Sequence, residues 1–175
     1  MLTKRKIATT DERCTLKIAG LPAPFDRATW NIAFSERGLS ELSLAASHSS
    51  IRTSKLEACS PRVKKIVKLL RARLSGERVN IPFSEFDLRG HPEFHVRIFK
   101  AMHAIPYGEV ATYGEVAEAA GSPLAFRACG QACRHNSIFI FIPCHRVVSA
   151  SGLGGFACGL HWKEALLKIE GYEMK

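Results

Sequence analysis

Apolar and polar residues alternate in short segments near the start of the chain. The segments are 15–18, 30–34 and 39–44, and Pro22, Pro24 and Gly38 interrupt the pattern. Strict alternation places every second side chain on the same face of a strand. The pattern therefore predicts a small antiparallel sheet within residues 12–50.

A helix with clear start and stop signals follows this sheet. Ser60 can cap the helix, Pro61 suits its first position, and Gly76 can end it. Its apolar face is formed by Val63, Ile66, Val67, Leu70 and Leu74, and lysines and arginines occupy the other face. The basic face is either a solvated surface or a nucleic-acid contact, and the solvated surface is the favoured interpretation.

Residues 80–91 are typical of a connecting segment, and helical patterns resume after them. The next helix begins at Pro92, and its apolar face carries Phe94, Ile98, Met102 and Ile105. A further helix opens at a capping box in which Thr112 and Glu115 can satisfy each other's backbone donors, and it ends at Gly121.

Another helix is predicted to open at Ser122-Pro123, again a cap followed by proline. With the preceding helix it would form a helix-turn-helix. Small residues surround Arg127 in this helix, namely Ala125, Ala128, Gly130 and Ala132. Small side chains allow a close approach either to a DNA groove or to the protein's own core, and the pattern leaves both open.

Composition places the chain among globular proteins. Its 175 residues are 46% apolar and 23% charged, enough for one ordinary domain or two small ones. The longest apolar run, around 138–143, is too short to cross a bilayer, and residues 1–13 lack the apolar core of a secretory signal. We expect a soluble intracellular protein, cytoplasmic, or nuclear if the source is eukaryotic.

The net charge of +9 indicates a polyanionic partner, but the charge is uneven. Residues 1–80 hold 16 basic and 7 acidic residues, whereas residues 81–175 hold 9 of each. No acid lies between Ala119 and Lys163, although this window contains Arg127, Arg134 and Arg146.

The cysteines do not predict a metal centre. They are Cys14, Cys59, Cys129, Cys133, Cys144 and Cys158. They do not form the paired spacing of a zinc site, and without an export signal we expect reduced thiols. No metal is predicted, although a site built from scattered cysteines and histidines of the first half stays open.

The stretch FIFIPCHRVV, residues 139–148, joins an apolar run to three reactive side chains. We expect 138–142 to be a buried strand that Pro143 ends. A reactive thiol at Cys144 needs a lowered pKa. His145 would point to the opposite side of an extended chain, so we expect it to act through water, with a carboxylate fixing its tautomer.

The first acids after Cys144 are Glu164 and Glu170, both on the terminal helix. We expect Glu170, at the end of that helix, to turn toward His145. The inward side of the helix is predicted to hold Leu160, Leu166, Leu167 and Ile169. The alternative is that Cys144 is only a small buried hydrophobe beside a surface histidine.

Taken together, the motif resembles the active-site signature of the O6-alkylguanine-DNA alkyltransferases. The resemblance covers most of residues 80–171, whereas the first half matches the family's variable N-terminal domain only weakly. Besides Ile142 to Val148 it includes Phe94-His95, Ile98-Phe99, Ile105-Pro106-Tyr107-Gly108, Thr112-Tyr113-Gly114, residues 128–136 and Gly159-Leu160 through Lys163 to Glu170.

The resemblance implies an α/β (α+β) fold with two domains. Residues 1–85 would form a small α/β domain with a ribonuclease-H-like antiparallel sheet and the basic helix. Residues 86–175 would form a mainly helical domain with a winged-helix-like helix-turn-helix. The protein would act as a monomer on double-stranded DNA, without a membrane and without a cofactor.

The resemblance also implies the chemistry, which is direct damage reversal. Such enzymes bind the minor groove, flip an alkylated guanine out of the duplex and transfer its O6-alkyl group to a cysteine. O6-methylguanine would be the chief substrate and O4-methylthymine a second candidate. The thioether product offers no evident route back to a thiol, so each molecule would act once.

Roles carry over residue by residue. Cys144 would accept the alkyl group, His145 would act as the base through water, and Glu170 would orient His145. Asn136 would tie the turn that precedes the thiol, and Tyr113 would donate to guanine N3 and stabilise the leaving purine.

The implied DNA contacts and pocket complete the site. Arg127 would fill the space left by the flipped base. The other DNA-contact residues are Ala128, Gly130, Arg134 and Tyr113, and the pocket residues are Pro143, Phe156, Ala157 and Cys158. Many relatives have tyrosine at the position of Phe156 and glycine at that of Cys158, so we expect a narrower pocket that prefers methyl to benzyl adducts.

Two other functions remain to be weighed. A lesion-binding module without transfer would lack the acceptor cysteine, which this chain retains. A cysteine hydrolase using Cys144 and His145 would lack a convincing oxyanion arrangement and would leave the helix-turn-helix unexplained.

Overall fold

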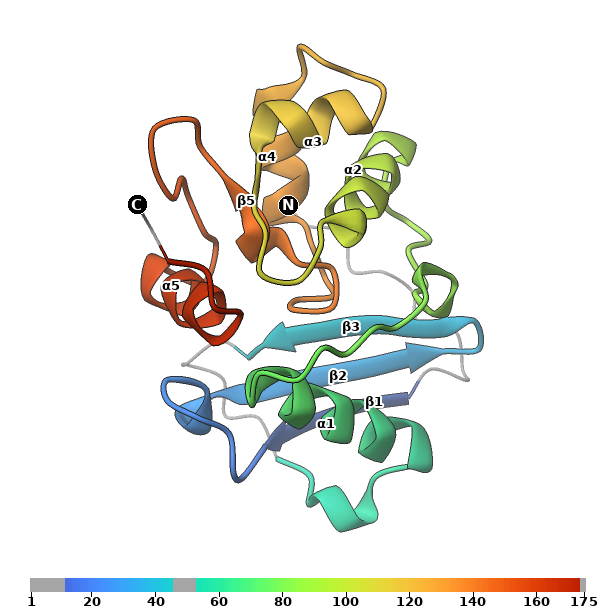
Figure 1. The fold of residues 1–175 in the computed structure, drawn as a ribbon. Coiled ribbons are helices and arrows are strands. Elements are labelled where there is room, and N and C mark those ends of the chain that lie inside the picture. Colours follow the sequence, from blue (N-terminus) through green and yellow to red (C-terminus); the bar gives the residue numbers. More distant parts are fainter. Residues whose placement is uncertain (1–11, 46–52, 174–175) are drawn as a thin grey trace.

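The computed structural model describes residues 12–45 and 53–173, and Figure 1 shows its mixed α/β architecture. Helix α1 packs along a three-stranded sheet, and the remaining helices lie beyond strand β3, at the other end of the molecule. Residues 1–11, part of the segment inspected for an export signal, lie outside the described residues. The elements are β1 (Glu12–Lys17), β2 (Thr29–Ser35), β3 (Gly38–Leu44), α1 (Pro61–Leu74), α2 (Glu93–Ala104), β4 (Ala111–Thr112), α3 (Tyr113–Ala119), α4 (Phe126–Arg134), β5 (Val147–Val148) and α5 (Leu160–Ile169).

The sheet confirms the alternation read from the sequence. Strand β2 lies between β1 and β3, and both pairings are antiparallel. Trp30 and Ile32 are fully buried, whereas the intervening Asn31 is half-buried and accepts a hydrogen bond from the Thr15 hydroxyl at 2.8 Å. One face of the sheet is thus committed to the core.

Helix α1 also forms as predicted. The Ser60 hydroxyl oxygen accepts a hydrogen bond from the backbone N–H of Val63 at 3.3 Å, Pro61 opens the helix, and Gly76 follows its end with φ +94°. All the predicted apolar-face residues are buried. Most basic residues of the helix are exposed, but Arg73 is buried with its guanidinium 4.9 Å from the Tyr107 ring centroid.

Replacing Ser60 with alanine should destabilise the protein by about 1 kcal/mol, since a helix cap is lost. The serine also donates to the Glu12 carboxylate at 2.6 Å, which ties the cap to β1. Urea denaturation would measure the change, and Ser151→Ala, at an exposed loop position, is the matched control. Equal stability of the two variants would contradict the capping role.

The apolar run 138–142 is not a strand, so that prediction is wrong. Ile138 forms a single bridge to Leu42 of β3, and the chain then turns, with Ile140 at φ +73° and the Ile142 N–H donating to the Ile138 carbonyl at 2.9 Å. An apolar run reports burial, but it does not distinguish a strand from a buried turn. The edge of β3 captures the start of the run through Leu42 N–H to Ser137 O and Phe139 N–H to Leu42 O, both at 2.8 Å.

Helix α4 begins later than predicted. Ser122-Pro123 lies in a turn closed by the Ala125 N–H donating to the Ser122 carbonyl at 2.9 Å, and the helix starts at Phe126. Proline is as well suited to the second position of such a turn as to the first turn of a helix. Helices α2 and α3 otherwise match the prediction, including both hydrogen bonds of the capping box at Thr112 and Glu115.

The inward side of α5 differs from the prediction at one end. Leu166 and Leu167 are buried, but Leu160 is exposed, and Lys163 takes the buried position instead. Positions 163, 166, 167 and 170 share one helical face, so the buried face runs from Lys163 to Glu170.

The two halves of the chain share one hydrophobic core. Phe25 packs edge-on against Trp162, with ring centroids 4.9 Å apart, and Trp30 stacks on Phe139 at 6.1 Å. The division into domains at residue 85 stays a prediction. Within the described ranges, no helix could span a membrane, and no cluster of three or more His, Cys, Asp or Glu side chains is placed to hold a metal ion.

Candidate active site

The thiol lies in a short turn that the fold holds on both sides. Cys144 to Arg146 form a single 3-10 turn, and β5 follows at once. Strand β5 pairs in parallel with β4, Ala111 opposite Val147, and β4 leads directly into α3. The turn carrying the thiol is therefore fixed to the start of the helix-turn-helix.

Asn136 braces the segment that precedes the thiol. Its amide nitrogen donates to the Ile142 carbonyl at 2.8 Å, and its amide oxygen accepts from the Ile138 N–H at 3.0 Å. The side chain thus spans the whole apolar turn, which agrees with the predicted tie, although the turn leads into Cys144 without an intervening strand.

His145 and Glu170 lie together, as expected. The His145 ring is fully buried, and its Nε2 lies 2.9 Å from Glu170 Oε1. An ionised carboxylate only accepts hydrogen bonds, so Nε2 carries the proton and Nδ1 keeps its lone pair. Nδ1 is buried and has no hydrogen-bond partner among the described residues. The ring is oriented to accept a proton at Nδ1.

Arg146 is part of the same network, which the sequence analysis missed. Its Nε and Nη2 donate to the two Glu170 oxygens at 2.8 Å each, and Nη1 donates to the Ile105 carbonyl at 2.6 Å. Arg146 was counted among basic residues available to DNA, but it is buried. A guanidinium between apolar residues on both sides, with β5 following, is a signal that a buried partner is needed.

Glu170 is ionised in this environment. Burial alone would favour the neutral acid, but hydrogen bonds from His145 and Arg146 outweigh it and hold the pKa at about 2. The Gly108 N–H adds a further hydrogen bond at 3.1 Å. The carboxylate is thus a fixed negative charge that three elements share.

Cys144 is a protonated thiol in the free protein. The residue is only 9% exposed, and its burial raises the pKa to about 11, against the opposing effects of Asn136 and Lys163. A nucleophilic thiolate therefore requires a base at the moment of reaction. Burial also lowers the pKa of Lys163 to about 8.

Lys163 was also counted among the basic residues around the thiol, and it too is unavailable to DNA. Its ammonium donates to the carbonyls of Val147 and Leu153, joining α5 to β5 and to the loop that follows it. Its place in the 163–166–167–170 face of α5 was the signal for this burial.

Tyr113 connects α3 to that loop. It is the first residue of α3, and its hydroxyl donates to the Gly155 carbonyl at 3.3 Å. A Cβ on Gly154, which has φ +69°, would come within 3.0 Å of the Tyr113 ring. The glycine is thus required for both backbone conformation and close approach.

The predicted pocket residues fall into two places. Phe156 is half-buried with its ring 5.7 Å from that of Phe139, Cys158 is half-buried, and Ala157 is exposed. Pro143 is buried and lines a cavity on another side of the turn, which Phe156, Ala157 and Cys158 do not line.

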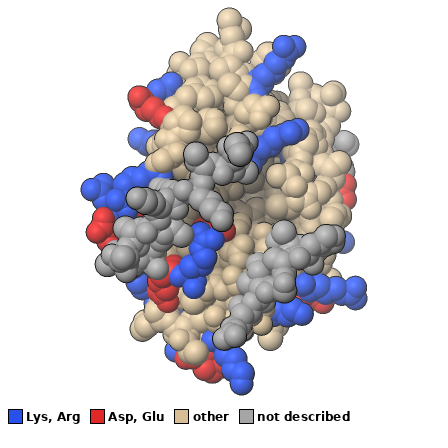
Figure 2. All heavy atoms as spheres, turned by 180° about the vertical axis from the view of Figure 1, so that it is seen from behind, with Lys and Arg blue, Asp and Glu red and all other residues tan. Residues whose placement is uncertain are grey.

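The outer face of α4 carries the predicted DNA contacts. Arg127, Ala128 and Arg134 are exposed, whereas Cys129 and Ala132 are buried, and Gly130 lies close to the Tyr113 ring. The small residues therefore serve both purposes that the sequence left open, on opposite faces of the helix. In the view from behind, lysines and arginines are scattered among acidic side chains on the visible surface and form no continuous stripe (Figure 2).

Two exposed apolar side chains beside Arg127 were not predicted. Leu124 is 92% exposed and Phe126 is 52% exposed, at the turn that leads into α4. The single-residue pattern of alternating apolar positions gave no indication of their exposure.

Comparisons with known proteins agree with this geometry. Residues 93–172 match the family described as 6-O-methylguanine DNA methyltransferase, DNA binding domain. A methylated-DNA–protein-cysteine methyltransferase of Mycolicibacterium paratuberculosis is 49% identical over 105 residues, covering 59% of this chain and 62% of the relative. That alignment thus spans less than two thirds of the relative's length.

Structural matches extend over both halves. The crystal structure of Mycobacterium tuberculosis O6-methylguanine methyltransferase superposes with a TM-score of 0.72 at 34% identity, covering 91% of this chain and 92% of that one. M. tuberculosis OGT in complex with DNA gives a TM-score of 0.68 at 39% identity, covering 81% and 86%. The chain therefore belongs to the O6-methylguanine DNA methyltransferase family.

Proposed function

We propose that this protein repairs duplex DNA by moving the alkyl group of O6-alkylguanine onto Cys144, once per molecule. O6-methylguanine is the chief substrate and O4-methylthymine a second. The protein acts as a monomer and uses no cofactor. The observation that carries the proposal is the buried series Cys144, His145 and Glu170, which lies in a turn joined by β5 and β4 to the helix-turn-helix.

The reaction balances without a further reactant. The Cys144 thiol gives its proton, through water, to His145 Nδ1, and Glu170 stabilises the imidazolium that forms. The thiolate attacks the alkyl carbon, so that an S–C bond forms while the C–O6 bond breaks. The electron pair stays on the purine, which takes up a proton. Overall, the thiol hydrogen ends on guanine and the alkyl group on sulfur.

Tyr113 and Arg127 act on the DNA. Tyr113 donates to guanine N3, where negative charge develops, because its hydroxyl stands at the start of α3 beside the 149–159 loop. Arg127 projects from the exposed face of α4 and fills the space of the flipped base. Ala128 lets the helix approach the groove closely, and Arg134 contacts phosphate.

Mass spectrometry tests the proposal directly. The protein is incubated with duplex DNA carrying one O6-methylguanine, and the intact mass and the peptide containing residue 144 are measured. We expect one added methyl group, on Cys144, with stoichiometric loss of the lesion. Binding of the lesion without any change in mass would indicate a lesion-binding module and overturn the proposal.

The size of the accepted adduct provides a further prediction. Cys158 adds bulk where many relatives have glycine, so Cys158→Gly should speed transfer from O6-benzylguanine by about tenfold and change methyl transfer little. Single-turnover rates with both adducts measure this, and Cys133→Ala, at another half-buried thiol, is the control. Equal rates for both adducts in the unaltered protein, unchanged by Cys158→Gly, would contradict the narrow pocket.

A further inference from the structure

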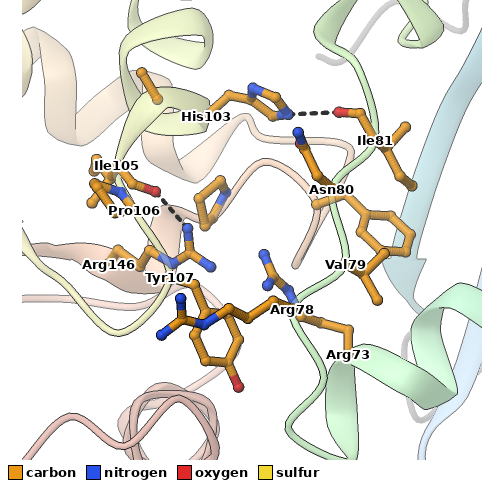
Figure 3. Close-up of a pocket in the computed structure, with 13 residues that line it drawn as sticks. Arg73, Arg78, Val79, Asn80, Ile81, His103, Ile105, Pro106, Tyr107 and Arg146 are labelled. Carbon is orange, nitrogen blue, oxygen red and sulfur yellow. Dashed lines mark hydrogen bonds between the residues drawn. The ribbon is translucent and has the colours of Figure 1, made fainter.

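A cavity of about 250 Å³ lies on the side of the catalytic turn away from Phe156 and Cys158 (Figure 3). Its walls come from the end of α1, the segment after it, the end of α2 and the turn around Pro143. The cavity is smaller than the roughly 300–1,000 Å³ of sites for drug-sized ligands. It therefore suits a small ligand.

The polar lining of this cavity is cationic. The guanidinium carbons of Arg73, Arg78 and Arg146 lie 4.9, 5.7 and 5.7 Å from the ring centroid of Tyr107, and Figure 3 shows the three groups converging there. His103 lines the opposite side. None of the residues that line the cavity is acidic.

The positive charge exceeds what the described carboxylates balance. Glu170 is shared by Arg146, His145 and the Gly108 N–H. No ion pair joins Arg73 or Arg78 to an acid within the described ranges. Grouping three guanidinium groups without matching acids is unfavourable unless an anion offsets their repulsion.

Arg73 points to where that anion would lie. Its side chain is buried, with the residue only 7% exposed, and its Nε has no hydrogen-bond partner in the described part of the chain. A buried, unsatisfied donor normally indicates a bound water, ion or ligand. Burial and the nearby Arg146 lower the pKa of Arg73, the shift expected when a cation lacks a partner.

We propose that this cavity is an anion site, separate from the alkyl-transfer pocket, that binds a phosphate group, either free inorganic phosphate or a small phosphate monoester. Arginine forks match the tetrahedral oxygens of phosphate. A dianion would balance Arg73 and Arg78 while Arg146 stays on Glu170. Of these groups, Arg78 is exposed at the cavity mouth, so it can be changed without opening the core.

Isothermal titration calorimetry with inorganic phosphate, at ionic strength held constant with sodium chloride, tests the site. We expect saturable binding of one phosphate, weakened about tenfold or more by Arg78→Gln, since a charge-assisted hydrogen bond is lost. Lys68→Gln removes the same charge from the exposed face of α1 and should bind like the unaltered protein. Glycerol phosphate in a parallel titration shows whether a monoester is accepted as well.

The opposite results are equally clear. Absence of saturable phosphate binding, or equal affinity of the Arg78→Gln and Lys68→Gln variants, would overturn the proposal. A selective loss of duplex DNA affinity in Arg78→Gln, with no phosphate binding by the free protein, would also overturn it and assign the arginines to the DNA backbone. Alkyl transfer is not measured in these titrations, so their outcome is independent of the proposed repair function.

Discussion

Replacing Cys144 with serine should abolish alkyl transfer while leaving affinity for the lesion duplex within about twofold. The hydroxyl is a far weaker nucleophile than a thiolate, and the base at His145 is arranged for a thiol of high pKa. Binding should persist because Arg127, Ala128 and Arg134 lie on the separate exposed face of α4. Single-turnover transfer and fluorescence anisotropy with the same duplex measure the two properties.

The matched control is Cys133→Ser, which changes another thiol without changing the proposed acceptor. This variant should transfer the methyl group at nearly the normal rate. Transfer that survives in Cys144→Ser and is lost in Cys133→Ser would move the acceptor to α4. Loss of both transfer and binding in Cys144→Ser, with circular dichroism unchanged, would contradict the separation of the thiol from the DNA-binding face.

Replacing Glu170 with glutamine should destabilise the fold by about 3–5 kcal/mol, because Arg146 would keep its buried charge without a counter-charge. Glu170 accepts hydrogen bonds from His145, Arg146 and Gly108, and an amide nitrogen in place of one oxygen would face these donors. Urea denaturation measures the loss, and we expect the melting temperature to fall by roughly 10 °C or more. Alkyl transfer should slow as well, since the tautomer of His145 is no longer fixed.

Glu164→Gln is the control, since it makes the same substitution at an exposed position of α5. It should change stability by less than about 0.5 kcal/mol. Equal stability of the two variants would contradict the role of the buried carboxylate, and so would an unaltered transfer rate in Glu170→Gln.

The same carboxylate makes stability depend on acid. The pKa of Glu170 is near 2 in the folded protein and near 4.5 when free, so the folded state favours the charged form. This contribution is complete above about pH 4.5 and is lost as pH falls toward 2. His145 acts in the same direction, since burial lowers its pKa and the folded state resists its protonation. Denaturation midpoints measured from pH 7 to pH 3 should decrease, and less steeply in Glu170→Gln.

The parts of the fold that the sequence predicted are those set by local signals. Helix α1 has its cap, its proline and its terminal glycine within one segment, and the apolar spacing between them is unbroken. The capping box at Thr112 is likewise complete within four residues. Such elements form where their own residues direct them.

The parts that were missed depend on distant partners. The conformation of residues 138–142 follows from the pairing of Ile138 with Leu42 and from the Asn136 side chain. Arg146 and its carboxylate at Glu170 are 24 positions apart, so no short window contains both. The sequence indicated that Glu170 faces His145 because acids are scarce after Cys144, but it gave no indication that an arginine shares the carboxylate.

The pairing of β3 with the segment before the thiol has a consequence for how the protein can be divided. Leu42 donates to Ser137 and accepts from Phe139, and Trp30 stacks on Phe139. A fragment that begins at residue 86 would lose these backbone partners and would expose Phe139 to solvent. The catalytic half is therefore not an independent module: grafting it onto another protein would require a replacement for the first three strands as well.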